Sequence, residues 1–347
     1  MSDLRSVQSD ALSFDVATVA YKGARESQED QLVSNFPLGQ ETGFAVLADG
    51  MGGHASGAIA SALVMSEVFT QLKMQEGQLD DGLLNIPETL RAVTDAANQR
   101  IADHIKTDDE THGMGSTLLT TVIRQNKLYW ISVGDSPLLL FRDGALRQLN
   151  KDHSMAPQID MMIKVGAMTE EAGRNHPDRN TLTSAMSGGV IDAIDCPSRP
   201  VALQPDDIVI AASDGLQFLS SATIAKTLKQ TQSGHCFEIA KALLTALQDL
   251  DNPDQDNAAI VVIKLNSGDQ NASALDADDL PVLAIADDES EENPLEETGP
   301  VAAKLMRVVQ LKRDADHPPA QTEVADAEDA PDEKVAYWYR GQKYYKD

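Results

Sequence analysis

The sequence predicts an α+β fold in which two mainly antiparallel β-sheets pack face to face and helices cover their outer faces, a four-layer α-β-β-α sandwich. Three observations predict it. Two long segments have apolar residues at helical spacing, several strand patterns follow one another with only tight turns between them, and continuous apolar runs stop at or near an aspartate. In such a fold each sheet buries its inner face against the other sheet.

Strand patterns precede helix patterns in the N-terminal part of the chain. Segments 16–21 and 31–36 have the composition of short strands, and segment 44–48 is a continuous apolar run of the kind found in strands covered on both faces. Apolar residues at helical spacing then predict helices over 56–72 and 87–105.

A series of consecutive strands begins after residue 116. Asp143 and Gly144 are a strong hairpin signal within it, because both residues accept a positive φ at low cost. Antiparallel pairing is therefore expected. The predicted strands are 117–123, 128–133, 138–141 and 146–149.

The next part of the chain starts with an irregular stretch. Residues 153–189, with scattered Met, Gly and Pro, are interpreted as a surface flap carrying some helix. Segment 207–212 is a further buried strand, and segments 221–229 and 237–250 have helical spacing. Segment 258–265 is predicted to close the domain as a strand.

A change of composition after residue 266 divides the chain into three parts. Residues 1–266 are the predicted folded domain. Residues 267–334 form an acidic low-complexity linker, because most of this segment has too few apolar residues to offset its chain entropy by burial. Within the linker, residues 301–313 are basic and apolar and fit either a helix or a strand.

The last residues, 335–347, differ again. Trp338 and four tyrosines lie beside basic residues there, a composition typical of binding hot spots. We interpret this segment as a docking motif for a partner protein or for the acidic surface of the chain's own folded domain. The plainer alternative is that the whole tail is a solvated acidic linker.

Charge and cysteine content exclude several function classes. The formal net charge is -27 at pH 7, so the chain repels phosphate backbones and anionic lipid, and neither nucleic acid nor membrane is expected as a partner. Cys196 and Cys236 are too few for a disulfide scaffold and lack zinc-site spacing. The sequence has no signal-peptide pattern and no apolar run of about 18 residues, so the cytoplasm is the expected compartment. The chain is also expected to be a monomer.

Acidic residues lie at the ends of the strand patterns. Asp49 and Asp214 come just after a buried run, and Asp256, Glu29 and Asp30 come just before one. Neighbouring strands can bring several such ends to one cleft, where carboxylates need a cation to stay charged together. Ligands made only of oxygen select Mg²⁺ or Mn²⁺. Each motif alone has a plainer interpretation, since Asp-Gly is usually a turn, but their combination in order favours a metal site.

Seven segments occur in order along the sequence, from GARESQED (23–30) through ADGMGGHASG (48–57) to DQDNAAIVVI (254–263). Together they resemble the protein phosphatase 2C family of metal-dependent protein phosphatases, in particular its bacterial branch. The resemblance covers about residues 14–265 in family order, and ADGMGGH is its most specific motif. The fold and the activity of that family are therefore expected here. The matching segments are GARESQED (23–30), ADGMGGHASG (48–57), GMGSTLLTTVI (113–123), ISVGDSPLLLFRDG (131–144), DHS (152–154), IAASDGLQ (210–217) and DQDNAAIVVI (254–263).

The resemblance implies an active site around two Mn²⁺ or Mg²⁺ ions, with a weaker third site. Asp49 matches the aspartate that bridges the two ions, and Gly50 matches the glycine whose carbonyl oxygen is a ligand. Asp214 and Asp256 match the other direct ligands, and Asp135 matches a residue near the third site.

Three further residues complete the implied site. Glu29 and Asp30 match the acidic pair that holds metal-bound water, and Arg25 matches the arginine whose planar fork grips the substrate phosphate. The implied reaction is hydrolysis of phosphoserine and phosphothreonine on bacterial signalling proteins, by a water that two metal ions activate. The expected partners are phosphorylated proteins, namely a cognate kinase and its substrates.

The chain departs from the family pattern at several positions near the expected cleft. Met51 stands where some members have a histidine, a candidate general acid, and His54 is interpreted as a helix-start residue rather than a catalytic one. Phe218 replaces a frequent acidic residue, which weakens the expected third metal site. Pro137 and Ser184 stand where arginines are usual, and these losses are expected to alter substrate grip or flap order.

Two other functions compete with an active phosphatase. A family member that keeps the fold without turnover would act as a phosphoprotein scaffold, and an unrelated metal-binding domain would share the motifs by coincidence. The complete set of implied ligands favours the enzyme, because a scaffold has no need of it.

Overall fold

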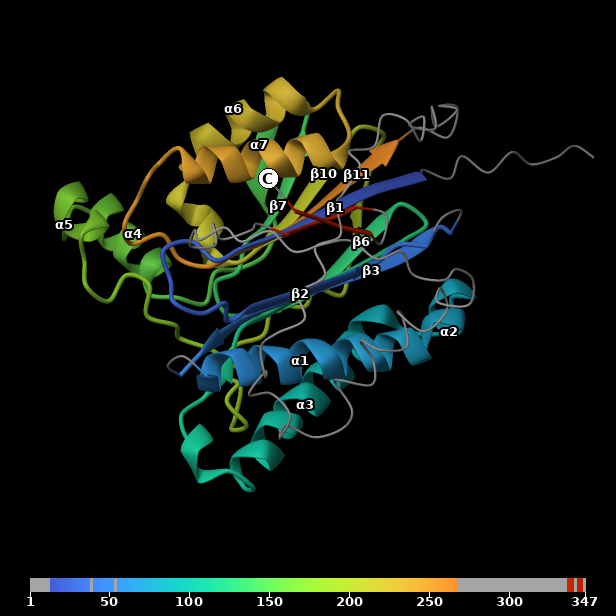
Figure 1. The fold of residues 1–347 in the computed structure, drawn as a ribbon, viewed down its shortest axis with the longest axis horizontal. Helices are drawn as coiled ribbons and strands as arrows, with labels where there is room; N and C mark the ends of the chain where they lie inside the picture. The colour runs from blue at the N-terminus through green and yellow to red at the C-terminus, as the bar shows by residue number, and fades with distance from the viewer. Residues whose placement is uncertain (1–12, 38–39, 53–54, 267–335, 340–341, 346–347) are drawn as a thin grey trace, which may run out of the picture. The chain divides into compact units, whose positions relative to one another are not determined.

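The computed structural model describes residues 13–37, 40–52, 55–266, 336–339 and 342–345 of the chain. Two β-sheets lie face to face in it, with helices on the outer face of each (Figure 1). The predicted four-layer sandwich is therefore confirmed. The linker 267–334, including the mixed segment 301–313, lies outside the described residues.

The first sheet combines strands from the two ends of the chain with strands from its middle. Its strand order is β13-β12-β1-β11-β10-β7-β8, and every neighbouring pair is antiparallel. The strands are β1 (Ser13–Tyr21), β7 (Leu138–Arg142), β8 (Ala145–Gln148), β10 (Ile208–Ala212), β11 (Ala258–Asn266), β12 (Ala336–Tyr339) and β13 (Gln342–Tyr345).

The second sheet has the order β2-β3-β5-β6-β9, and the short strand β4 pairs with the end of β3. Its pairs are also antiparallel. The strands are β2 (Asp30–Asn35), β3 (Thr42–Met51), β4 (Gly115–Ser116), β5 (Leu118–Arg124), β6 (Lys127–Val133) and β9 (Val201–Ala202).

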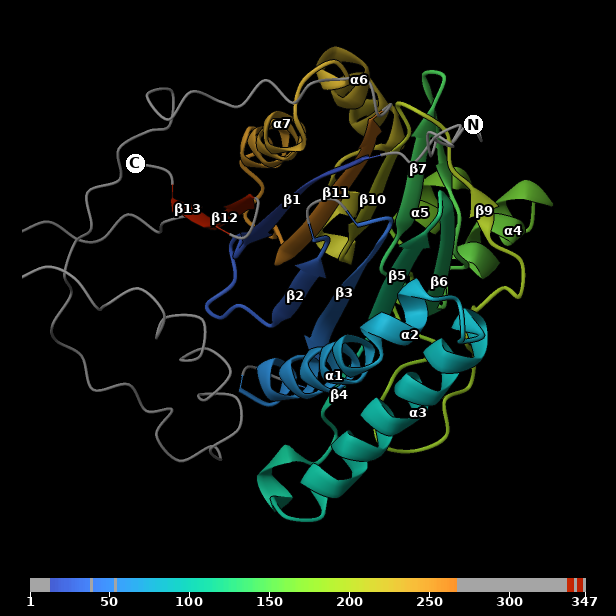
Figure 2. The same cartoon turned by 90° about the vertical axis from the view of Figure 1, so that its right-hand side faces the viewer.

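Helices form the two outer layers and a separate flap. The buried stripe predicted for the second long helix is present, since Leu90, Val93, Ala97 and Ile101 are all buried. Helices α1, α2 and α3 cover the second sheet and α6 and α7 cover the first, whereas α4 and α5 lie in the flap (Figures 1 and 2). Their bounds are α1 (Ala55–Met74), α2 (Glu76–Asp80), α3 (Ile86–Ile105), α4 (Ala156–Lys164), α5 (Glu170–Arg174), α6 (Ser221–Thr231) and α7 (Cys236–Gln248), with 3-10 turns η1 (Asp109–Thr111) and η2 (Asp214–Phe218).

Three apolar clusters hold the layers together. One lies between the sheets and contains Leu47, Leu119 and Val261. Another joins the first sheet to α6 and α7, and the third joins the second sheet to α1 and α3. Strands β5, β10 and β11 are buried along almost their whole length, because both of their faces meet one of these clusters.

The turn between β7 and β8 has the predicted geometry. Asp143 and Gly144 have φ of 52° and 76°, so both central residues of this two-residue hairpin are left-handed, as a type I′ turn requires. The turn fixes the register in which Arg142 faces Ala145.

One sequence prediction needs correction in detail. Strand β3 does not stop before Asp49 but continues to Met51, because backbone pairing with β4 extends it past the end of the apolar run. The aromatic end of the chain, predicted only as a docking segment, contains two strands. Cys196 and Cys236 are free and buried. Among the described helices, none has the length and apolar character needed to cross a membrane.

Candidate active site

A cleft of about 700 Å³ opens where the ends of β3, η2 and the loop after β1 come together. Seven of the eight residues predicted for the site line it, so the sequence motifs do converge. The eighth, Asp30, is buried behind the cleft wall. The seven are Arg25, Glu29, Asp49, Gly50, Asp135, Asp214 and Asp256.

Asp49 is held by its backbone near the end of β3. Its N–H donates to Thr117 Oγ1 at 3.0 Å, and its carbonyl oxygen accepts the Thr117 N–H at 2.8 Å. Ser116 Oγ also donates to that carbonyl at 3.1 Å. These bonds fix the Cα of Asp49 while leaving its carboxylate to face the cleft.

Gly50 and Gly57 lie in a place too tight for a side chain. A Cβ on Gly50 would lie 2.0 Å from the Gly57 carbonyl oxygen, and one on Gly57 would lie 2.1 Å from Glu29 Oε2. The glycines of the ADGMGGHASG motif thus allow β3, the start of α1 and the Glu29 loop to approach one another. The Gly50 N–H donates to the Glu29 carbonyl oxygen at 3.2 Å, which ties this loop to β3.

Asp30 is buried and directly opposite Asp49 in the β2–β3 register. Ser213 Oγ donates to Asp30 Oδ2 at 2.7 Å and accepts the Ala259 N–H at 2.9 Å. Ser213 therefore links Asp30 to the strand that follows Asp256. Burial, together with the charges of Asp214 and Asp256, raises the pKa of Asp30 to about 7.

The carboxylates of the cleft repel one another. Burial first, and then the charges of Asp30, Asp214, Asp135 and Asp256, hold the pKa of Asp49 well above its ordinary value. Burial and the charge of Asp256 raise the pKa of Asp214 to about 6. The protein's own cations do not balance this group of acids, so the site favours a bound cation.

Asp135 lies on the side of the cleft toward the flap. It is 7% exposed, and burial followed by the charges of Asp214 and Asp152 raises its pKa to about 8. Its backbone carbonyl accepts a hydrogen bond from Gln217 Nε2 at 3.2 Å, which joins the β6–β7 turn to η2. Gln217 therefore places Asp135 beside the element that begins with Asp214.

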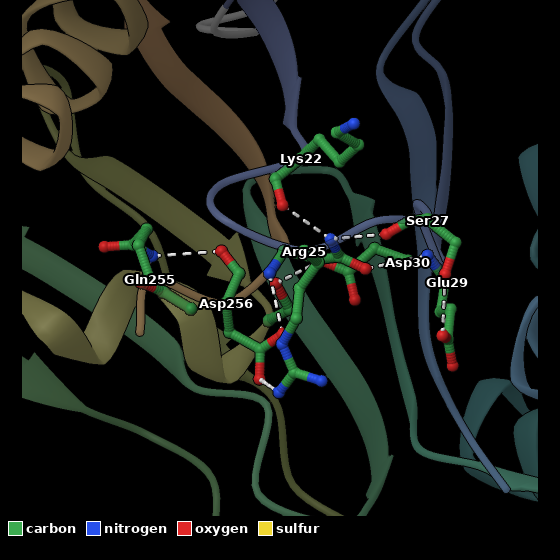
Figure 3. Close-up of polar contacts among 10 residues, drawn as sticks. Lys22, Arg25, Ser27, Glu29, Asp30, Gln255 and Asp256 are labelled. Carbon is green, nitrogen blue, oxygen red and sulfur yellow. Dashed lines mark hydrogen bonds and ion pairs between the residues drawn. The ribbon is translucent and has the colours of Figure 1, made fainter. Parts of the chain in front are cut away.

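Arg25 lies over the cleft in an ion pair with Asp256. Its Nη2 is 2.6 Å from Asp256 Oδ2, and the Arg25 side chain is 58% exposed (Figure 3). A guanidinium in this position can offer its other N–H groups to a phosphate in the cleft. The exposure shows that solvent, rather than protein, surrounds those groups.

Asn257 is a structural residue of the site that the sequence analysis did not single out. Its Nδ2 donates to the carbonyl oxygens of Lys22 and Ser27 at 2.7 and 3.0 Å, and its Oδ1 accepts the Glu29 N–H at 2.8 Å. The loop that carries Arg25 and Glu29 is thereby closed around one buried amide. The only sequence signal was its place directly after Asp256.

Gly23 lets the same loop dock on the segment before β11. Its φ is +65°, and a Cβ there would lie 2.4 Å from the Asp256 carbonyl oxygen. The neighbouring Ala24 N–H donates to the Gln255 carbonyl oxygen at 2.8 Å. Any other residue at position 23 would push Arg25 away from Asp256.

The structure describes four of the residues that depart from the family pattern, namely Met51, Pro137, Ser184 and Phe218. Ser184 is buried, and its hydroxyl bridges the Ala193 N–H at 2.9 Å and the Ala193 carbonyl at 2.8 Å. The Pro137 carbonyl accepts the Ala212 N–H, and Met51 lines the cleft. Phe218 is exposed at the end of η2. The side chain of His54 lies outside the described residues.

His153, in the DHS segment, is a buried structural residue. Its Nδ1 accepts the Gly134 N–H at 3.3 Å, and its own N–H donates to the Gly134 carbonyl at 3.0 Å. Its carbonyl accepts the Thr183 N–H at 2.7 Å. His153 thus joins the start of the flap to its end. Burial lowers its pKa.

The donor set of the cleft fits hard divalent cations. Within the described part of the chain, no three His, Cys, Asp or Glu side chains lie close enough to hold an ion by themselves. The acidic side chains that line the cleft are nevertheless all carboxylates, which offer oxygen donors. Their charges raise one another's pKa. Mg²⁺ and Mn²⁺ accept such donors and complete their coordination with water.

Comparison with known proteins agrees with the fold and with the family that the motifs resemble. The model of the protein phosphatase 2C family matches residues 14–158. A protein phosphatase 2C-type protein of Streptococcus pyogenes serotype M6 is 30% identical over 202 residues, which are 56% of this chain and 75% of that protein. The serine/threonine protein phosphatase PstP of Mycobacterium tuberculosis is 31% identical over 185 residues, 53% of this chain and 34% of PstP.

Solved structures have the same fold. The structure of the M. tuberculosis phosphatase PstP aligns with a TM-score of 0.60 at 29% identity and covers 73% of this chain and 99% of that one. A second structure, the PstP catalytic domain in complex with two manganese ions, aligns with a TM-score of 0.58 at 28% identity, over 74% of this chain and 99% of that one. With the sequence relatives, these structures establish that the chain belongs to the protein phosphatase 2C family.

Proposed function

We propose that this chain hydrolyses phosphoserine and phosphothreonine on proteins, as a metal-dependent serine/threonine phosphatase of bacterial signalling. The observation that carries the proposal is the convergence of Asp49, Asp214 and Asp256 from distant strand ends on one cleft beside Arg25. A phosphoprotein scaffold would not need carboxylates held together against their own repulsion.

The proposed roles follow from the geometry of the cleft. Asp49, Asp214, Asp256 and the carbonyl oxygen of Gly50 would hold two Mn²⁺ or Mg²⁺ ions. Such a pair lowers the pKa of a water and stabilises the charge that develops on a transferred phosphoryl group.

Other residues of the cleft would place water and substrate. Glu29 and Asp30 would orient water through hydrogen bonds. Arg25 would bind two phosphate oxygens in place of its contact with Asp256. Asp135 is proposed to serve a weaker third ion.

The organisation of the chain is also a proposal. Residues 1–266 would form the phosphatase domain, residues 267–334 an acidic linker, and residues 335–347 a docking segment. The protein would act as a monomer in the cytoplasm, on a cognate kinase and that kinase's substrates.

The test is hydrolysis of a phosphothreonine peptide by the wild type, Asp214→Asn and Asp206→Asn, with Mn²⁺ and with chelator. Asp206 is exposed in the turn before β10, so it is a matched control. We expect metal-dependent turnover that falls by about 10²-fold or more in Asp214→Asn only. A wild type without turnover on several peptides at saturating Mn²⁺ would favour the scaffold function.

A further inference from the structure

The outer edge of β1 is covered by a segment from the far end of the chain. One side of β1 pairs with β11 over its whole length, from Ser13 to Tyr21. The other side pairs with β12, where Ala17 to Ala20 face Tyr339 to Ala336. Figure 2 shows β12 and β13 beside β1. Without them β1 would be an edge strand with a row of unpaired backbone groups.

The register places the residues of the two tail strands in rows across the sheet. Val19 is opposite Tyr337, which is opposite Tyr344, and Thr18 is opposite Trp338, which is opposite Lys343. Val19 belongs to the apolar cluster under α6 and α7. Aromatic and β-branched residues in directly opposite positions are stabilising cross-strand pairs.

The hairpin is expected to be stable only when it pairs with β1. The sequence between Tyr339 and Gln342 is Arg340-Gly341, and a two-residue spacing that includes glycine predicts a tight turn. An isolated two-stranded hairpin is marginally stable in water, whereas three strands support one another. β1 supplies the third strand, so docking and folding of residues 336–345 are one step.

The tether makes this docking efficient within one chain. A random coil with as many residues as the segment 267–335 would have a root-mean-square span of roughly 45 Å, which corresponds to an effective concentration on the order of millimolar. Even a weak strand pairing is populated at that concentration. The segment 335–347 also carries Arg340, Lys343 and Lys346 against one acid, Asp347, in a chain of formal net charge -27. Its charge therefore complements that of the domain.

We propose that the outer edge of β1 is a strand-acceptor site, and that residues 336–345 of the same chain occupy it as a tethered hairpin. The site is a place for β-augmentation, in which main-chain hydrogen bonds supply affinity and alternate side chains supply selectivity. A partner that presents an extended segment reaches the edge of β1 only after the hairpin leaves. This proposal does not depend on phosphatase activity.

Amide hydrogen exchange on the full-length chain tests the proposal. The three proteins are the wild type, Trp338→Pro and Ala325→Pro. Proline at 338 removes an N–H from the middle of β12 and fixes its φ, whereas proline at 325 is a matched change in the acidic linker. In an antiparallel strand every second N–H points to the same neighbour. We expect those amides of Ala17–Ala20 that face β12 to exchange at least about tenfold faster in Trp338→Pro than in the other two proteins.

Each outcome decides between docking in one chain and its alternatives. Amides of β10 and β11 report that the domain is folded in all three proteins. Equal exchange of β1 in the three proteins would overturn the proposal. Protection of β1 that disappears on dilution from about 100 µM to about 1 µM would also overturn it, because the hairpin would then come from a second copy. Protection that is independent of concentration and lost only in Trp338→Pro supports the tethered hairpin.

Discussion

The two walls of the cleft differ in how the chain holds them. The carboxylate wall consists of Glu29, Asp49, Asp135, Asp214 and Asp256. These residues lie at or next to the ends of paired strands, and long-range hydrogen bonds hold the backbones of Glu29, Asp49 and Asp135. The flap wall consists of the cleft-lining residues between Asn180 and Asp192, which lie in an irregular segment.

The flap wall is attached by isolated bridges and single hydrogen bonds rather than by strand ladders. Isolated bridges join Ser116 to Met186 and Ser154 to Leu182. The Asn98 side chain accepts the Gly188 N–H at 2.9 Å and donates to the Gly189 carbonyl at 2.6 Å. The proposed metal ligands thus lie at the ends of sheet strands, whereas the flap residues that line the cleft lie in an anchored loop, the usual place for groups that select a ligand.

The largest expected effect is on the carboxylate wall. Asp49→Asn keeps the shape of the side chain. It removes a carboxyl group whose ionisation is opposed by the charges of four other acids. We expect kcat/KM with Mn²⁺ to fall by about 10³-fold, while the melting temperature of the metal-free protein stays the same or rises. Peptide hydrolysis and thermal unfolding in chelator measure the two quantities. A melting temperature that falls together with activity would make Asp49 a structural residue instead.

Asn257 and Asn98 allow a matched comparison, because each binds backbone groups of one wall through its side-chain amide. Asn257→Ala removes the amide that binds two carbonyls and one N–H of a half-buried loop, so it should cost about 2–3 kcal/mol of stability. We expect KM for a phosphopeptide to rise about tenfold, because Arg25 loses its fixed position. Denaturant unfolding and steady-state kinetics measure both effects.

Asn98→Ala is the comparison for that prediction. Its two bonds lie in a partly exposed place, so we expect less than about 1 kcal/mol of lost stability. Equal losses of stability in the two variants would contradict the difference between the walls.

The metal-free protein should become less stable as pH rises. The folded-state pKa is raised to about 7 for Asp30, about 8 for Asp135 and about 6 for Asp214, from an ordinary value of 3.8. Between the ordinary and the raised values the folded state binds more protons than the unfolded state, so the free energy of unfolding falls with pH over the window from about 4 to about 8.

Thermal unfolding in chelator at several pH values checks the sign of that slope. Mn²⁺ binds the charged carboxylates and should remove most of the pH dependence of the melting temperature. Asp49→Asn should flatten the slope, because it removes a repelling charge, and Asn98→Ala should leave it unchanged. A melting temperature that rises steadily with pH in chelator would contradict the prediction.

The sequence was sufficient for the parts of the molecule that depend on local pattern. The long helices and central strands were predicted because apolar residues recur at their periods, as in Leu90, Val93 and Ala97 of α3. Strands β4 and β9 have two residues each, too few for a period to be visible. The pairing of β4 with β3 also explains why Asp49 lies inside a strand rather than after it.

The support of the site could not be predicted from pattern. Ser213 is far from Asp30 in sequence, and Asn257 is far from the Lys22 and Ser27 carbonyls that it binds. Such contacts exist only after the strands have paired. The sequence does contain a signal for the hairpin at residues 336–345. Aromatic residues lie on both sides of a two-residue spacing that includes glycine.

The smallest expected effect is on the flap wall. Asp192 and Val190 line the cleft without belonging to the proposed metal ligands, and Val190 is 87% exposed. An exposed carboxylate at the mouth of the cleft can pair with a basic residue near the phosphorylated one, and such surface pairs contribute at most about 1 kcal/mol. Asp192→Asn should therefore lower kcat/KM about threefold for a phosphothreonine peptide with a neighbouring lysine, and not for the same peptide with glutamine there.

High salt should abolish that difference between the two peptides, because exposed charges are screened. An equal loss on both peptides would place Asp192 among the groups that act on the phosphate itself, and the separation of the two walls into chemistry and selection would then fail.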